Sequence, residues 1–176
     1  PVAGPHEVTA LGLSGPWATG LDTSTTHACA LATDNQILCA GQNNAGQLGW
    51  PSATVAETAS FRAVPDITNA VEVSTSLGGT CFRRTDGTVA CFGGEATLGG
   101  GATTLTEHPS PADVPGLTAV TAIESSSFGT GTCAIHGTER QVSCWGADFP
   151  AFGTGSSRGL GAAVFVVDGA LDVTEI

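Results

Sequence analysis

A segment that contains two cysteines occurs three times in this chain at a constant spacing. The first cysteines of the three copies are Cys29, Cys81 and Cys133, and each lies 52 residues after the one before. A fixed period of about this size is typical of repeat architectures, in which each unit buries its surface against its neighbours. We therefore expect three repeated structural units of about 52 residues.

The composition favours β-structure within these units. The 176 residues include 25 glycines and nine prolines, which are the residues that end strands and form turns. No window of the sequence has a sustained helical period, so we predict an all-β fold. The hydrophobic content of 41% is sufficient for a folded core.

Each first cysteine is followed by a second one after a turn signal. In the second copy, Cys81 and Cys91 flank the residues Thr85-Asp86-Gly87, which suit a three-residue hairpin loop closed by a left-handed glycine. Such a loop places the two cysteines opposite each other on antiparallel strands, with Cα atoms about 4.5–5.5 Å apart. The first copy has Asp34-Asn35 at this point, and asparagine also tolerates the left-handed conformation.

Metal ligation is the alternative explanation for the cysteines. Zinc sites favour cysteines two to four residues apart, and no such pair exists here. The histidines show no repeated relation to the cysteines; they are His6, His27, His108 and His136. We therefore predict no metal site and three disulfides within hairpins, which are Cys29–Cys39, Cys81–Cys91 and Cys133–Cys144. Disulfides indicate an oxidising compartment, so we expect the protein to be secreted or on the cell surface.

The first copy carries a longer pattern. From His27 to Gly49 it reads H-x-C-A-L-x-x-D-x-x-x-x-C-x-G-x-N-x-x-G-Q-L-G. This pattern resembles the regulator of chromosome condensation repeat in its cysteine-containing bacterial form. The resemblance implies four-stranded antiparallel blades of a β-propeller, usually seven to a ring. Three repeats would therefore make an incomplete ring in one chain.

The repeats divide the chain into one repeat domain, residues 1–176, with five parts. We expect residues 1–11 to be the closing strand of a preceding blade and residues 171–176 to be the first strand of a following one. The three blades between them are residues 12–67, 68–117 and 118–170. Within the first blade, Trp17–Leu21 is predicted as the first strand.

The charge excludes some classes of partner. The net charge is −11, with 16 acidic residues against five arginines and no lysine. Binding to nucleic acid normally requires a basic surface, so nucleic acid is not an expected partner. No apolar run is long enough to cross a bilayer, and we expect no membrane insertion.

The sequence contains no complete motif for catalysis or nucleotide binding. Gly129–Ala134 matches G-x-G-x-x-A, but it leads into a predicted disulfide-bearing strand and not into a helix. Gly94–Gly99 has the glycine spacing of a P-loop, but glycine follows it where lysine is required. There is no serine-nucleophile elbow and no recurring pair of carboxylates. We predict that the protein is not an enzyme and has no cofactor.

The loop after the first cysteine hairpin is the candidate binding region. Amide side chains adapt to partners and tryptophan anchors them, so a possible protein-contact loop is formed by Gln42, Asn43, Asn44 and Trp50. Gly46–Gly49 within this loop is interpreted as an internal brace with Leu48 buried.

Together these features favour a non-enzymatic, extracellular structural or protein-binding module. We expect it to be completed by further blades or by self-assembly into a homo-oligomer or polymer, including a surface or fibre-forming subunit. Its partner would be another protein or copies of itself. The alternative is a secreted protein inhibitor of an enzyme, similar to the β-lactamase-inhibiting propellers of the family. The aromatic content of 6%, without tyrosine, argues against the inhibitor.

Overall fold

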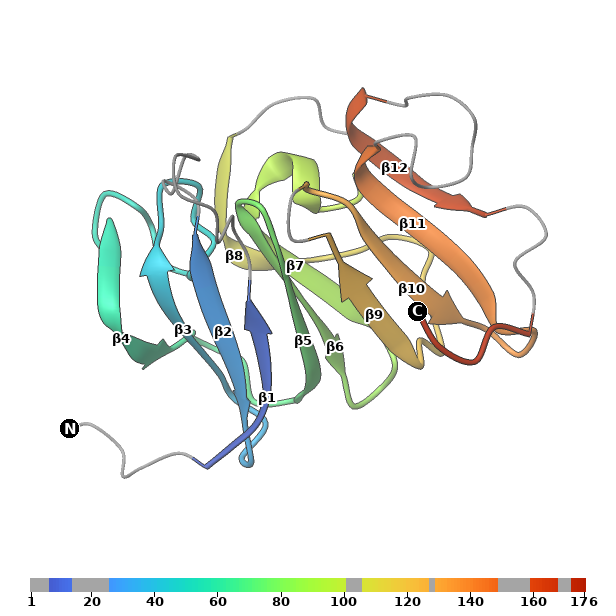
Figure 1. The fold of residues 1–176 in the computed structure, drawn as a ribbon, viewed down its shortest axis with the longest axis horizontal. Helices are drawn as coiled ribbons and strands as arrows, with labels where there is room; N and C mark the ends of the chain where they lie inside the picture. The colour runs from blue at the N-terminus through green and yellow to red at the C-terminus, as the bar shows by residue number, and fades with distance from the viewer. Residues whose placement is uncertain (1–6, 14–25, 101–105, 127–128, 149–158, 168–171) are drawn as a thin grey trace.

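The computed structural model describes residues 7–13, 26–100, 106–126, 129–148, 159–167 and 172–176. The described strands form three four-stranded antiparallel sheets that lie side by side, each built from strands consecutive in the chain (Figure 1). The first sheet contains β1 (Val8–Leu13), β2 (His27–Ala32), β3 (Ile37–Gln42) and β4 (Glu57–Ala63). The second contains β5 (Ala70–Ser76), β6 (Gly79–Arg84), β7 (Val89–Gly94) and β8 (Glu107–Asp113), with the short 3-10 helix η1 (Glu95–Thr97) after β7. The third contains β9 (Ala122–Ser125), β10 (Thr132–His136), β11 (Gln141–Asp148) and β12 (Gly159–Val166).

The central hairpin of each sheet follows from its turn residues. Asn35 and Gly87 have φ angles of 63° and 78°, which is the left-handed conformation that the sequence predicts for a three-residue loop. The extra residue of the third copy is taken up in its turn, where Gly137 and Arg140 have φ angles of 71° and 50°. The strands on either side therefore keep the same pairing in all three sheets.

This pairing places the cysteines of each copy directly opposite each other. The bonded pairs are Cys29–Cys39, Cys81–Cys91 and Cys133–Cys144, with Cα–Cα distances of 4.1, 4.1 and 4.0 Å. These are the pairs that the spacing predicts. Each bridge closes one hairpin, and none connects two sheets.

A glycine two residues after each second cysteine is required by the sheet. Gly41, Gly93 and Gly146 have φ angles of 112°, 120° and 92°, and each lies at a β-bulge towards the outer strand. A Cβ atom at Gly93 would lie 2.5 Å from the carbonyl oxygen of Gly78, in the turn between β5 and β6. A larger residue would therefore be excluded both by its backbone conformation and by the close approach of the neighbouring chain.

The sheets pack face to face around two hydrophobic clusters. We call the contact between the first and second sheets the first seam, and that between the second and third sheets the second seam. Phe82 and Phe92 of the second sheet fill the first seam, and Trp145 of the third sheet fills the second. The first strands of the sheets, β1, β5 and β9, lie next to one another at these seams. Burial of these apolar faces is the main force that holds the sheets together.

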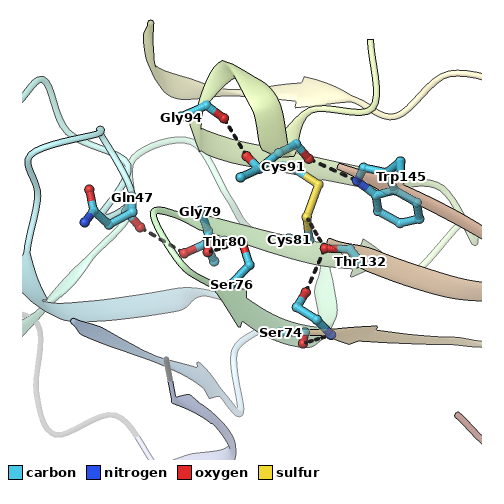
Figure 2. The surroundings of a disulfide bond; sticks show 12 residues. Gln47, Ser74, Ser76, Gly79, Thr80, Cys81, Cys91, Gly94, Thr132 and Trp145 are labelled. Carbon is cyan, nitrogen blue, oxygen red and sulfur yellow. Dashed lines mark hydrogen bonds between the residues drawn. A yellow bond between two sulfur atoms is a disulfide. The ribbon is translucent and has the colours of Figure 1, made fainter. Parts of the chain in front are cut away.

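Buried polar groups add specific contacts across both seams (Figure 2). Thr80 donates to the carbonyl oxygen of Gln47 at 2.9 Å, and His27 Nε2 lies 2.8 Å from Thr80 Oγ1. Across the second seam, Trp145 Nε1 donates to the carbonyl oxygen of Thr97 at 3.0 Å. These bonds satisfy groups that the packing removes from water, and so fix how the sheets are placed relative to each other.

The structure differs from the predicted assignment of the N-terminal residues. Residues 1–11 were expected in the sheet of a preceding blade, but β1 pairs with β2 and is the inner strand of the first sheet. The sheet that contains the first hairpin therefore begins at Val8, not at residue 12. Trp17–Leu21, predicted for this inner place, lies outside the described residues. Val8–Leu13 and Trp17–Leu21 both fit the sequence pattern of a first strand, and the pairing with β2 selects Val8–Leu13.

Candidate protein-contact surface

The candidate loop connects β3 of the central hairpin to β4, the outer strand of the first sheet. It spans residues 43–56, between the end of β3 at Gln42 and the start of β4 at Glu57. Gln42 Nε2 donates to Glu57 Oε2 at 2.6 Å, and the Asn43 amide donates to the carbonyl oxygen of Ala56 at 2.9 Å. These two bonds close the base of the loop.

Asn43 lies inside this loop and not on its surface. Its side chain is fully buried, and Nδ2 donates to the carbonyl oxygens of Trp50 and Val55 at 2.7 and 2.6 Å. Its Oδ1 accepts the Leu48 amide at 2.8 Å. All three of these side-chain hydrogen bonds of Asn43 are therefore made to the backbone of the loop itself. The exposed amide is that of the next residue, Asn44.

The Gly46–Gly49 segment is arranged as an internal brace, in agreement with the interpretation from sequence. Gln47 is fully buried; its Oε1 accepts the Ala45 amide at 2.8 Å and its Nε2 donates to Asn44 Oδ1 at 3.0 Å. Leu48 is fully buried in the first seam. The Gln47 carbonyl accepts the Thr80 hydroxyl of the second sheet, as Figure 2 shows. The loop is thus tied to both sheets.

A second tie runs from the loop to the outer strand of the second sheet. Glu107 on β8 accepts the amide and the hydroxyl of Ser52, each at 2.6 Å. A Cβ atom at Gly46 would lie 2.8 Å from Glu107 Cγ, so the loop also approaches β8 closely at that point. Sequence analysis missed Glu107, because nothing in the local pattern links residues 55 positions apart.

Trp50 lies at the rim of this braced loop. Its ring packs partly against the hydrophobic cluster of the first seam, and the guanidinium of Arg62 on β4 lies 4.8 Å from the ring centroid. The indole Nε1 is buried and has no hydrogen-bond partner among the described residues. Arg62, which was not predicted, is exposed. The rim therefore offers a fixed, half-buried tryptophan covered by an exposed cation.

Titratable groups elsewhere have structural surroundings. The hydrogen bond from the Thr88 hydroxyl lowers the pKa of Asp86 in its turn, and burial lowers the pKa of His136. Desolvation, with the nearby carboxylate of Glu72 second, raises the pKa of Glu124 on β9. Within the described ranges, no group of three His, Cys, Asp or Glu side chains is placed to hold a metal ion. Nor does any helix in those ranges have the length and apolarity to span a membrane.

Comparison with known proteins shows which family of repeats and which solved structures the chain is similar to. Residues 21–47 match the family described as the Regulator of chromosome condensation (RCC1) repeat. The resemblance to this repeat is therefore confirmed. No curated protein matches the chain. The matched stretch contains the first cysteine pair and the first five residues of the loop, 43–47.

Three solved structures share the fold. Prp20p from Saccharomyces cerevisiae, described with binding properties to Gsp1p and histones, aligns with a TM-score of 0.65 and 8% identity over 100% of this chain and 42% of that chain. Human WBSCR16 aligns with a TM-score of 0.61 and 17% identity over 80% of this chain and 36% of its own. A structure of Kap60 bound to yeast RCC1 (Prp20) gives 0.58 and 10% over 82% and 30%. The three sheets thus have the fold of β-propeller-type blades, and the chain spans between 30% and 42% of the length of these structures.

Proposed function

We propose that the protein is a non-enzymatic protein-binding module and that the rim of the first sheet, formed by Asn44, Trp50 and Arg62, contacts the partner. The observation that carries this proposal is the state of Trp50. A half-buried tryptophan with an arginine over its ring has the composition of an interface hot spot. The Nε1 atom itself is buried, so the groups that a partner would contact are the exposed part of the ring and the Arg62 guanidinium.

Rigidity of the loop supports this role. Asn43, Gln47 and Glu107 hold the loop by hydrogen bonds before any partner arrives. A preorganised surface loses less conformational entropy on association than a mobile one. The structural relative Prp20, described with Kap60, Gsp1p and histones, shows that this fold can carry protein contacts.

The disulfides support an extracellular setting. Three bridges in 176 residues, with no free cysteine among the described residues, suit an oxidising compartment. We propose a secreted or surface-located module that further blades, or copies of the chain, complete into a larger assembly. The net charge of −11 favours partners with a basic contact surface.

The test compares capture by matched variants. Wild type, Trp50→Phe with Arg62→Glu, and the control Thr54→Ala are immobilised, and proteins retained from the extracellular medium of the source cells are quantified by mass spectrometry. We expect proteins that bind wild type and Thr54→Ala but lose at least about tenfold in retention on the rim variant. Equal retention on all three proteins would refute the rim as the contact surface. Thr54 is the control because it is exposed in the same loop.

A further inference from the structure

The inner strand enters each seam in the same way. At the first seam, the amide of Ala70 donates to the carbonyl oxygen of Asn35 in the preceding hairpin turn, at 3.1 Å. At the second seam, the amide of Val120 makes the same bond to Gly87 at 2.9 Å. Ala70 and Val120 are both buried, as are the residues three positions later, Val73 and Ile123. The entering strand thus fills each seam with a pair of aliphatic side chains.

The C-terminal residues make this same entry at the third sheet. The amide of Val173 donates to the carbonyl oxygen of Arg140, which holds the left-handed position in the third hairpin turn as Asn35 and Gly87 do in theirs. Arg140 Nε donates back to the Val173 carbonyl at 2.6 Å, just as Asn35 Nδ2 donates to the carbonyl of Ala70 at 2.7 Å. Val173 therefore occupies the place of an inner-strand residue.

The face that receives Val173 matches the faces inside the two seams. This face is the outward side of the third sheet, which we call the following face. It includes Cys133, Ile135, Val142, Cys144 and Val167, together with Ala122 and Phe165. Val167 donates its amide to Val142 as Val64 and Val114 donate theirs to the corresponding strands of the first and second sheets. Ile176, at the second aliphatic position, remains 38% exposed. The residues at 172–176 thus fill this face only in part.

At the opposite end of the described residues, the corresponding inner-strand pair is exposed. Thr33 donates to the Glu7 carbonyl at 2.9 Å, the bond that Thr85 makes to Asn69 in the second sheet, so Val8 and Leu11 correspond to the buried pair of β5. Val8 and Leu11 are 50% and 55% exposed. Ala30, which pairs with Leu11 on the neighbouring strand β2, is buried. The exposed apolar surface on this side of the first sheet therefore lies at β1.

The two terminal segments also have the same sequence pattern. Glu7-Val8-Thr9-Ala10-Leu11 and Asp172-Val173-Thr174-Glu175-Ile176 each read acid, valine, threonine, any residue, aliphatic. A face that accepts one of these pentads has the shape and hydrogen-bonding groups to accept the other. The pentad of β1 is moreover paired with β2 and so presented in an ordered strand, whereas residues 172–176 are not in a described strand. An ordered segment loses less entropy when it docks.

We propose that the following face of the third sheet is an interface between copies of this chain. The face takes the Glu7–Leu11 pentad of a second copy in the place that residues 172–176 hold in the isolated chain. The contact is head to tail, because the two surfaces are different parts of the molecule, and its repetition leads to a ring or an open polymer. This inference rests on the self-assembly part of the proposed function and is independent of the rim around Trp50.

The experiment uses the full 176-residue chain in its oxidised form, with mass measured by light scattering after size exclusion over a range of concentrations. Replacing Val173 and Ile176 by asparagine empties the following face and should strengthen association at least about tenfold, seen as masses of two or more chains at concentrations where wild type is one. Adding Val8→Thr and Leu11→Thr to this variant should return it to single chains. Thr174→Asn, at an exposed position between the two replaced residues, is the matched control and should behave as wild type.

A folding control and two possible results determine whether the proposed interface is correct. Circular dichroism of each variant must show the wild-type β spectrum, which separates loss of docking from loss of folding. In folded variants, no mass increase on emptying the face would overturn the proposal. A mass increase that persists with threonine at positions 8 and 11 would overturn it as well, because association would then use another surface. Capture of a partner through Trp50 is measured separately, so either proposal can fail alone.

Discussion

Trp145 tests whether the second seam holds the third sheet in place. This side chain is fully buried between the second and third sheets, and its Nε1 donates to the Thr97 carbonyl at 3.0 Å. Phe92 holds the same position after the second cysteine in the second sheet, so phenylalanine suits the shape of a seam. Replacing Trp145 by phenylalanine therefore removes the hydrogen bond while keeping an aromatic ring, and replacing it by alanine removes both.

The expected losses follow from these contacts. Trp145→Ala should lower the free energy of unfolding by about 3–5 kcal/mol, the range for removing a large buried aromatic side chain. For a chain of this size that corresponds to a fall in Tm of about 6–20 °C. Trp145→Phe should cost about 1–3 kcal/mol, because the Thr97 carbonyl is left buried without its donor.

The measurement is urea unfolding of the oxidised protein at 25 °C, followed by circular dichroism. Trp50→Phe is the matched control, since Trp50 is half-buried and its Nε1 has no acceptor among the described residues. That substitution should cost less than about 1 kcal/mol. Equal losses for the two Trp→Phe variants would refute the assigned hydrogen bond. A loss below about 1 kcal/mol for Trp145→Ala would refute the packing of the seam itself.

Three further predictions concern the bridges, the pH dependence and the loop. Replacing Cys81 and Cys91 together by alanine should cost about 2–4 kcal/mol in urea unfolding, because the unfolded chain gains freedom; no loss would contradict this. The pKa of Glu124 is raised by desolvation and then by Glu72, so the ionised carboxyl destabilises the fold at neutral pH and the penalty disappears as pH falls below the ordinary pKa. Glu124→Gln should therefore be more stable to unfolding than wild type at pH 7 and equal to it near pH 4. A variant that is less stable than wild type at pH 7 would contradict the raised pKa of Glu124. Asn43→Ala should cost about 1–3 kcal/mol in thermal unfolding, since it leaves buried loop carbonyls unpaired, whereas a neutral effect would show that water replaces the amide.

The features that the sequence predicts correctly are local ones. The cysteine spacing and the residues of each turn, such as Asn35 and Gly87, predict the hairpins and their bridges, because both depend on no more than 12 consecutive residues. The pattern of the first copy resembles the regulator of chromosome condensation repeat, and this resemblance implies the four-stranded blades that the structure contains. Local sequence does not predict which of the adjacent residues Asn43 and Asn44 is buried. The two have the same chemistry, and the path of the loop decides which side chain points inward.

The features that escape the sequence depend on distant pairing. The inner strand of the first sheet is separated from β2 by residues 14–26, and Trp17–Leu21 within this interval fits the same sequence pattern as Val8–Leu13. The partners of the candidate loop, Arg62 and Glu107, come from other strands and have no signal of their own. Recognising that residues 172–176 repeat the entry of an inner strand requires the hydrogen bond to Arg140 as well as the letters.

The placement of the disulfides has a mechanical consequence. Each bridge joins residues 10 or 11 positions apart within one hairpin, and the connections between sheets are made by packing and hydrogen bonds alone. If the chain is stretched from its ends, the blades should part first at the seams, while each bridged hairpin stays closed. Every intact bridge then withholds about 30 Å of chain from extension, at about 3.3–3.6 Å for each bypassed residue. Under load, the oxidised protein should therefore lengthen in blade-sized steps to a shorter limit than the reduced protein.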